Sequence, residues 1–144
     1  MSAMTYFFVG LTCGTAASWL GARRMSKGRL ILLGIILDGL TCLPFYFCHT
    51  LPQIKAALFV HAFVIPLIII PRTVLMQQAV AGRLHGRMFA LVNVTVFGMT
   101  GISAGLSGLM IAHMAPGTLF LAVGIIGTLV GTLGFRVKAL RGAR

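Results

Sequence analysis

Long apolar runs separated by short polar connections make up almost the whole chain. Five of these runs approach the length of about 20 residues that a helix needs to cross a hydrocarbon core. They cover residues 4–21, 30–48, 56–76, 88–112 and 118–135. No run shows the alternation typical of a strand. The pattern therefore predicts an all-α membrane protein, a bundle of five transmembrane helices that forms a single domain over residues 1–144.

The composition favours a lipid environment over an aqueous one. Hydrophobic residues make up 58% of the chain and charged residues 9%, whereas soluble domains carry about 25% charged residues. A soluble fold of this size needs polar residues to cover its surface, and this chain has few of them. We therefore expect the lipid bilayer to be its main partner.

Positive charges collect on one side of the predicted topology. Eleven of the twelve Lys and Arg residues lie in segments 22–29 and 72–87 or in the tail after residue 135, and only Lys55 lies in an opposite connection. The positive-inside rule then places the N-terminus outside and the C-terminus in the cytoplasm, in an inner or plasma membrane. Because the net charge of +11 comes in short clusters between apolar runs, it does not indicate a nucleic-acid partner.

The first run has an alternative interpretation as a secretory signal peptide. Such signals begin with a positively charged region, whereas Arg23 and Arg24 follow the apolar run here. We therefore expect residues 4–21 to form a helix of the bundle.

Asp38, the single acidic residue, is predicted near the middle of the second helix. A carboxylate at the bilayer centre costs about 2.5–3.5 kcal/mol on insertion scales, which makes it a functional-site candidate. Two interpretations stay open: a proton-coupling group in a transport cycle, or a hydrogen-bonded acid that joins two helices, with Thr41 one turn away. No Lys or Arg is expected at its depth.

His61, Pro66 and Asn93 are further candidates for transport or coupling. Counting 1.5 Å per residue from the predicted helix ends puts His61 about 10 Å from Asp38 in depth, so no contact is expected. Pro66 and Pro71 are expected to break or bend the third helix, and interrupted helices often line transporter sites. Asn93 is a candidate hydrogen-bond donor between helices.

Small residues recur at helical spacing and predict close helix packing. The pattern occurs at Gly10 and Gly14, and again at positions of the fourth and fifth helices: Gly101, Gly105, Gly108, Gly127 and Gly131. Such faces let backbones approach closely in lipid. Static packing and helix movement during transport are both compatible with it.

The chain offers no combination of residues typical of an enzyme. One acid excludes paired-carboxylate chemistry, and the histidines and cysteines do not have metal-ligand spacing. We expect no catalytic residues, no cofactor and no metal.

Residues 75–93, LMQQAVAGRLHGRMFALVN, resemble the major facilitator superfamily. The resemblance is to the cytoplasmic turn between the tenth and eleventh helices of that family, which Gln77, Gly86 and Arg87 fit. Residues 14–30 are similar to the basic turn between helices eight and nine. The glycine-rich fourth run and residues 116–121 resemble helices eleven and twelve of the drug and macrolide efflux branch. The family's usual acids in these cytoplasmic turns have no counterpart in this chain.

The resemblance equates the five runs with helices eight to twelve of a twelve-helix exporter of small hydrophobic molecules. It implies that the third run faces the substrate cavity, that the first and fourth lie between the two transporter halves, and that the second is peripheral. Without a counterpart to the first seven helices, the chain is expected not to transport alone. Its partner would be a missing transporter half or an oligomer. The alternative is a five-helix interaction subunit that pairs with another transmembrane chain.

Overall fold

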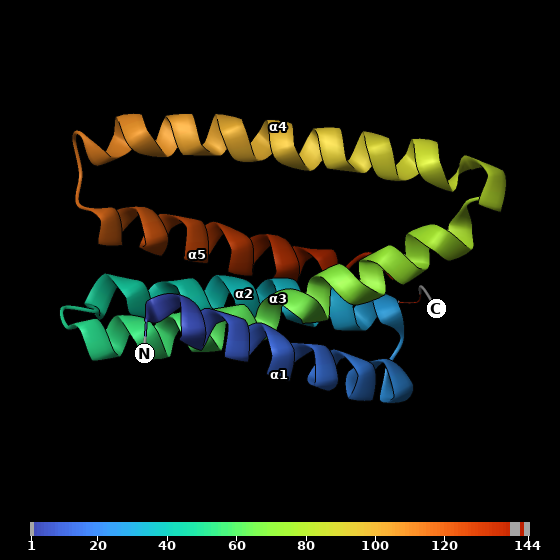
Figure 1. Cartoon of the computed structure of the whole chain (residues 1–144), viewed down its shortest axis with the longest axis horizontal. Coiled ribbons are helices and arrows are strands. Elements are labelled where there is room, and N and C mark those ends of the chain that lie inside the picture. Colours follow the sequence, from blue (N-terminus) through green and yellow to red (C-terminus); the bar gives the residue numbers. More distant parts are fainter. Residues whose placement is uncertain (1, 139–141, 143–144) are drawn as a thin grey trace.

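The computed structural model describes residues 2–138 and residue 142, so Arg141 and Arg144 of the predicted basic tail lie outside the described residues. Helices account for nearly all of this part, and it contains no strand. The elements follow in order (Figure 1): α1 (Ala3–Arg24), α2 (Lys27–Cys42), η1 (Leu43–Phe47), α3 (Leu51–Ala79), η2 (Gly82–Leu84), α4 (His85–Ile111) and α5 (Pro116–Gly134). The predicted all-α bundle of five helices is confirmed.

Four segments are long and apolar enough to cross a membrane, which indicates a multi-pass membrane protein. Within the described residues they are Lys27–Phe47, Leu51–Ala79, Gly82–Ile111 and Pro116–Gly134. Helix α1 has 22 residues but is not among them. Its hydroxyl side chains, such as Thr12 and Thr15, lower its hydropathy. A crossing by α1 therefore stays a prediction.

The start of α3 is set by local capping chemistry. The side chain of Gln53 accepts hydrogen bonds from the backbone N–H groups of Thr50 (3.1 Å) and His49 (3.0 Å). Thr50 and Gln53 form a capping box, and Pro52 occupies the first turn, where its missing N–H costs nothing. The helix consequently begins at Leu51, whereas the predicted start was residue 56.

Pro66 and Pro71 both lie inside α3, which runs unbroken from Leu51 to Ala79. Of the two expected outcomes, a break or a bend, the helix shows the bend. The helix changes direction along its length, so that its last turns lead away from the bundle toward α4 (Figure 1). Each proline removes one backbone hydrogen bond, which allows a bend without ending the helix.

Helices α1, α2, α3 and α5 pack together, with α2 between α3 and α5 and with α1 against α3. Glycines make the close approach of α1 possible. A Cβ added at Gly10 or Gly14 would meet the backbone carbonyl of Phe59 or Phe63, respectively. The glycine spacing of α1 therefore serves the α1–α3 contact.

The fifth helix packs on α2 through its glycine face. A Cβ at Gly131 would lie 2.7 Å from the Ile36 side chain, and one at Gly127 would lie 3.4 Å from the Cα of Gly39. Both predicted packing glycines of α5 therefore lie against a neighbouring helix.

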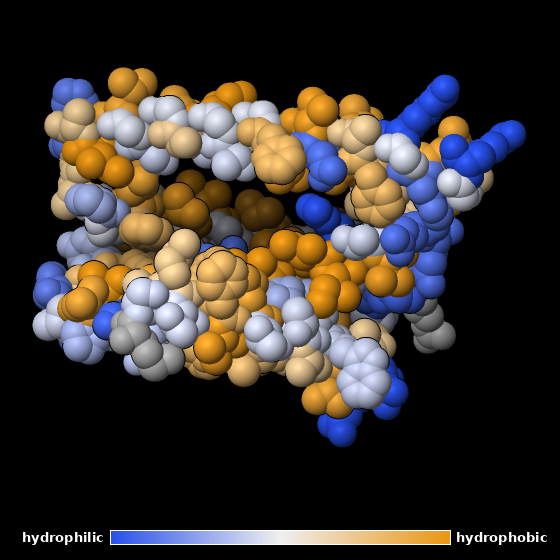
Figure 2. All heavy atoms as spheres, in the orientation of Figure 1, coloured by the Kyte–Doolittle hydropathy of each residue, from blue (hydrophilic) through white to orange (hydrophobic). Residues whose placement is uncertain are grey.

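Helix α4 stands apart from the other four (Figure 1). It contains no buried residue. A Cβ added at Gly98, Gly101, Gly105 or Gly108 would meet nothing within 4 Å in the part of the chain that the structure describes. Figure 2 shows apolar side chains along both sides of the gap that separates α4, and strongly hydrophilic ones at the end where α3 meets α4. The glycine face of α4 thus has no partner within the described chain.

Candidate functional site

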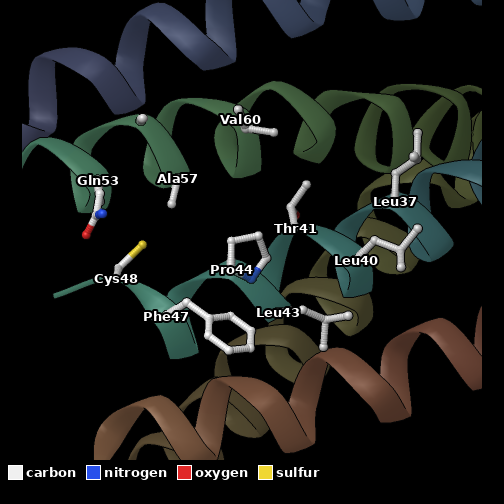
Figure 3. Close-up of a pocket in the computed structure, with 11 residues that line it drawn as sticks. Leu37, Leu40, Thr41, Leu43, Pro44, Phe47, Cys48, Gln53, Ala57 and Val60 are labelled. Atoms are coloured by element: carbon white, nitrogen blue, oxygen red, sulfur yellow. The ribbon is translucent and has the colours of Figure 1, made fainter.

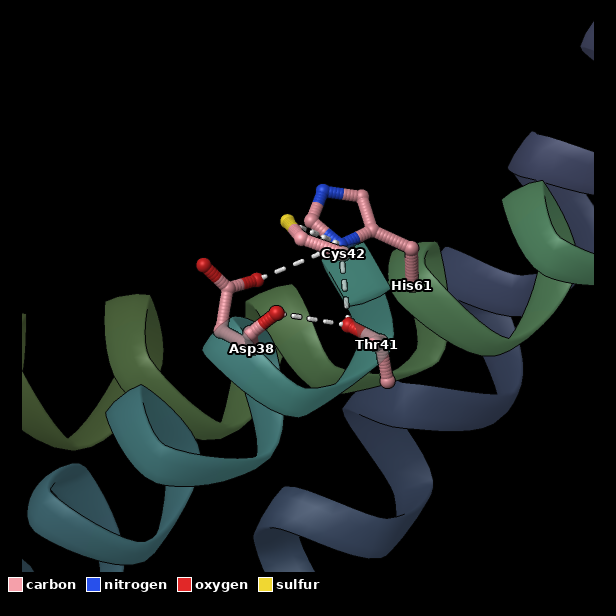
Figure 4. Close-up of polar contacts among 4 residues, drawn as sticks. All are labelled: Asp38, Thr41, Cys42 and His61. Carbon is pink, nitrogen blue, oxygen red and sulfur yellow. Dashed lines mark hydrogen bonds and ion pairs between the residues drawn. The ribbon is translucent and has the colours of Figure 1, made fainter. Parts of the chain in front are cut away.

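Asp38 of α2 and His61 of α3 face each other inside the bundle (Figure 4). The Nδ1 atom of His61 lies 3.5 Å from Oδ1 of Asp38, and the two side chains are 24% and 36% exposed. The sequence-based expectation that these residues lie about 10 Å apart in depth is therefore wrong. No Lys or Arg was expected at the depth of Asp38, and the residue that approaches it is a histidine, which forms an ion pair only when it is protonated.

The error comes from the helix ends. His61 is ten residues after the start of α3 at Leu51, which is about 15 Å at 1.5 Å per residue. Asp38 precedes the end of α2 by four residues, and η1 then adds five residues at about 2 Å each. It therefore lies about 16 Å from the same end of the bundle. Both residues are consequently near the middle of a hydrocarbon core about 30 Å thick.

Thr41 connects the two residues. Its hydroxyl donates a hydrogen bond of 2.8 Å to the backbone carbonyl of Asp38, and the same oxygen lies 3.0 Å from Nδ1 of His61. Since the single hydroxyl hydrogen is used on the carbonyl, the oxygen can accept a hydrogen bond from Nδ1. This network is satisfied when Nδ1 of His61 carries a proton.

The proton on Nδ1 faces more than one acceptor. Besides the oxygen atoms of Thr41 and Asp38, the Sγ atom of Cys42 lies 4.0 Å from it. With one titratable proton, the pair is either a carboxylate with an imidazolium or a carboxylic acid with a neutral imidazole. Both forms have zero net charge, which the interior of a bilayer tolerates far better than a lone ion. The arrangement can therefore hold one proton without a net charge.

Aspartate, cysteine and histidine are also common metal ligands, so Asp38, Cys42 and His61 could in principle form a metal site. Among the described residues, no group of three or more His, Cys, Asp or Glu side chains could hold a metal ion.

An apolar cavity of approximately 700 Å³ lies beside the pair, between the α2–η1 segment and α3 (Figure 3). Its walls include Leu40, Pro44, Phe47 and Val60, and Thr41 is among its few polar lining residues. Ligand cavities commonly have volumes of about 300–1,000 Å³. Thr41 thus touches both the cavity and His61.

A second cavity, of approximately 740 Å³, lies among η1, α3 and α5. The Phe45 ring in its wall stacks on Phe120 of α5 with centroids 4.9 Å apart, and it meets the His61 ring edge-on at 6.2 Å. Through Phe45, the orientation of the imidazole depends on how η1 and α5 pack. His61 is therefore in contact with the wall of the first cavity through Thr41 and with the wall of the second cavity through Phe45.

Two other predicted site residues do not join the pair. Pro66 is buried in α3, five residues after His61, which is about 140° around the helix. Asn93 is exposed on α4, and its side chain makes no hydrogen bond within the described chain. Neither residue contributes to the polar network around Asp38.

The predicted cytoplasmic turn is held by a residue that the sequence did not single out. The Nε2 atom of His85 lies 3.0 Å from the carbonyl oxygen of Gln77 and 2.9 Å from that of Val80. This bridges the end of α3 to the start of α4. Gly86 has open space around it, and Arg87 is exposed.

Cys42 and Phe45 were also missed as site residues. A usable signal existed, because residues three and four positions after Asp38 share its helix face. Thr41 and Cys42 occupy those two positions.

No family model, no curated protein and no solved structure matches this chain.

Proposed function

We propose that this chain is part of a membrane transporter that exports small hydrophobic molecules and uses a proton gradient. It would correspond to the C-terminal part of a major facilitator efflux permease, which the turn at residues 75–93 resembles. The observation that carries the proposal is the pairing of Asp38 with His61 in the middle of the bundle. An ionisable pair at that depth is costly and is typical of proton pathways.

The neighbourhood of the pair supports coupling between a proton and a bound molecule. Thr41 lines the 700 Å³ cavity and also contacts His61, at 3.0 Å. A molecule in that cavity changes the hydration of Thr41. It thereby changes how well the network stabilises charge on His61 or Asp38. The walls are almost entirely apolar, which favours a hydrophobic ligand.

The charge distribution supports an inner or plasma membrane with the N-terminus outside and the C-terminus in the cytoplasm. The α1–α2 turn and the α3–α4 turn both carry arginines, whereas the η1–α3 side carries only Lys55. Basic residues remain preferentially on the cytoplasmic side.

A second candidate function is that of an interaction subunit, and α4 is the observation in its favour. Its glycine face meets no other part of the described chain. Arg72 of α3 lines a cavity of approximately 290 Å³ next to α4, and its buried Nε atom has no hydrogen-bond partner among the described residues. Further helices from another chain or segment would fill this side.

The two functions are separated by an efflux measurement in cells that express the protein from its natural gene. Cells are loaded with a lipophilic fluorescent dye, and its exit is followed for the unchanged protein, Asp38→Asn, and a deletion of the gene. A proton-coupled exporter predicts that Asp38→Asn and the deletion slow the exit equally. Thr132→Val is a matched control, because Thr132 is exposed on α5 and bonds only its own helix.

If the deletion slows efflux but Asp38→Asn does not, the interaction subunit is favoured, because the chain then matters without its proton site. If neither change affects any dye or drug tested, both the transporter and the substrate class are wrong. Transport by the purified chain alone in liposomes would contradict its need for partner helices.

A further inference from the structure

The cationic side chains of this chain have almost no internal counter-charge. Twelve Lys and Arg residues face a single acid, Asp38. That acid lies at mid-depth and is already paired with His61. The cations at the α1–α2 turn therefore have no acidic side chain of this chain available as a counter-charge.

This turn forms a concave site. A cavity of approximately 320 Å³ is lined by the residues of the turn: Ala22, Arg23, Arg24, Met25, Ser26 and Lys27. Arg23 and Arg24 are exposed, and Lys27 is half-buried. Lys27 also donates a hydrogen bond of 3.1 Å to the side chain of Gln78 on α3, which holds it in place. Three cationic residues thus line one hollow of a size suited to a phosphate group.

Arg23 is oriented by an aromatic ring. Its guanidinium carbon lies 3.6 Å from the centroid of the Trp19 ring. Stacking uses the flat face of the guanidinium, so its N–H groups remain available at the edge. Planar, fixed donors of this kind match the oxygens of a phosphate.

Trp19 also relates the turn to the membrane surface. Its side chain is 56% exposed, one turn before the basic residues that end α1. Tryptophan prefers the level of the lipid headgroups, where its ring is at the apolar boundary and its N–H remains hydrated. With α1 crossing the membrane, as the proposed function requires, the cavity beside Trp19 is at the depth of lipid phosphates.

We propose that the α1–α2 turn binds the phosphate of an anionic phospholipid, held by Arg23, Arg24 and Lys27 with Trp19 beside the glycerol region. A lipid fits better than a soluble anion because the apolar sides of α1 and α2 continue from the cavity into the hydrocarbon. The acyl chains of a bound lipid can follow them. Basic pockets between helices are suited to such headgroups.

The test uses Trp19 as its reporter, since the chain has one tryptophan. The purified full-length protein in a zwitterionic detergent is titrated with phosphatidylglycerol carrying brominated acyl chains, which quench nearby tryptophan. Brominated phosphatidylcholine is the neutral reference. We expect phosphatidylglycerol to quench at much lower concentration. The variant Arg24→Gln with Lys27→Gln should reduce this preference by roughly fivefold for each charge removed.

The control variant is Arg83→Gln with Arg87→Gln, which removes two exposed charges from the α3–α4 turn and leaves the cavity intact. It should keep the preference. An equal loss in both variants would mean unspecific attraction and would overturn the site. Complete displacement of the lipid by millimolar inorganic phosphate would overturn the lipid as occupant. Should the first variant lose helicity, Arg24→Lys in its place must retain the preference, or the proposal is wrong.

Discussion

Gly39 of α2 and Gly124 of α5 meet backbone to backbone at the crossing of their helices. A Cβ added at Gly124 would lie 2.7 Å from the carbonyl oxygen of Gly39, and one added at Gly39 would lie 2.8 Å from that of Gly124. Apolar side chains gain little by leaving lipid for a protein interior, so membrane helices depend on such close packing. This crossing brings α5 against the helix that carries Asp38.

The substitution Gly39→Ala should therefore destabilise the bundle. The new methyl group would lie 2.5 Å from the backbone nitrogen of Thr128, and backbone atoms cannot move aside as a flexible side chain can. We expect a loss of about 1–3 kcal/mol, the usual cost of overpacking. Thermal unfolding in detergent, followed by circular dichroism, measures it.

Gly98→Ala is the matched control for that measurement, because a Cβ at Gly98 meets nothing within 4 Å in the described chain. It should leave the unfolding temperature unchanged or slightly raised, since alanine favours helix over glycine by about 1 kcal/mol. Equal destabilisation by both substitutions would show that the α2–α5 crossing is not tight.

Hydropathy was sufficient to predict the helices, because apolar runs interrupted by Arg23–Lys27 and by the residues around Pro116 leave few alternatives. It was insufficient to predict that Asp38 meets His61. That contact depends on where α3 begins and on the 3₁₀ geometry of η1. The start of α3 is set by local hydrogen bonds around Thr50 and Gln53, and η1 begins with a proline in its first turn. Average hydropathy detects neither feature.

The glycine pattern was informative about the kind of contact but not about the partner. Gly131 of α5 and Gly105 of α4 lie in the same sequence pattern. A Cβ added at Gly131 would lie 2.7 Å from the Ile36 side chain, whereas one added at Gly105 would meet nothing within 4 Å in the described chain. The spacing shows that one face of a helix consists of small residues, but which helix packs on that face depends on the arrangement of all helices. A packing prediction from one sequence therefore cannot identify the neighbouring helix.

The protonation state of Asp38 should depend on His61. With His61→Gln, the carboxyl loses its cationic partner, and an unpaired carboxylate at this depth is expected to convert to the neutral acid. Infrared spectroscopy of the protein in lipid detects this as the carbonyl stretch of a protonated carboxyl group. Asp38 is the only acidic side chain in the chain, so the band has one side-chain source.

Two variants control that spectrum. Asp38→Asn must abolish the band, which assigns it. His113→Gln alters an exposed histidine in the α4–α5 connection and should leave the spectrum as it was. If the unchanged protein lacks the band, its continued absence in His61→Gln would contradict a pair of carboxylate and imidazolium at Asp38 and His61.

Thr41 and His61 should show a measurable interaction energy. Thr41→Val removes the hydroxyl that lies 3.0 Å from Nδ1 of His61. A double-mutant cycle with His61→Gln, read from unfolding free energies, should give a coupling of about 0.6 kcal/mol and at most about 1.7 kcal/mol, the average and the maximum measured for hydrogen bonds between membrane helices. Strict additivity would mean that the hydroxyl and the imidazole do not interact in the folded protein.

The proposed orientation can be tested with a native cysteine. Cys48 follows η1 on the side assigned to the exterior, and Ala81 lies exposed between α3 and α4 on the side assigned to the cytoplasm. In a protein with Cys13→Ala and Cys42→Ala, a membrane-impermeant maleimide should label Cys48 in intact cells. When Cys48 is also replaced by Ala, Ala81→Cys should be labelled only after permeabilisation. The reverse result would invert the topology.

The empty face of α4 leads to a prediction that separates folding from function. Gly101→Ile with Gly105→Ile adds bulk where the described chain has open space, so the isolated protein should unfold at the same temperature as before. If partner helices dock on that face in cells, the same change should abolish dye efflux. Large side chains there would prevent close backbone approach.

The matched control adds bulk on the opposite face of α4. Ser103→Ile with Ser107→Ile lies about 140–180° from the glycines at 100° per residue, and Ser103 is exposed while Ser107 is half-buried. Efflux should survive this control. Loss of efflux in both variants would indicate that α4 is sensitive to bulk on any side, whereas loss in neither would mean that the glycine face is simply exposed to lipid. Only loss confined to the glycine face supports a partner there, because the described part of the folded chain offers that face no contact within 4 Å.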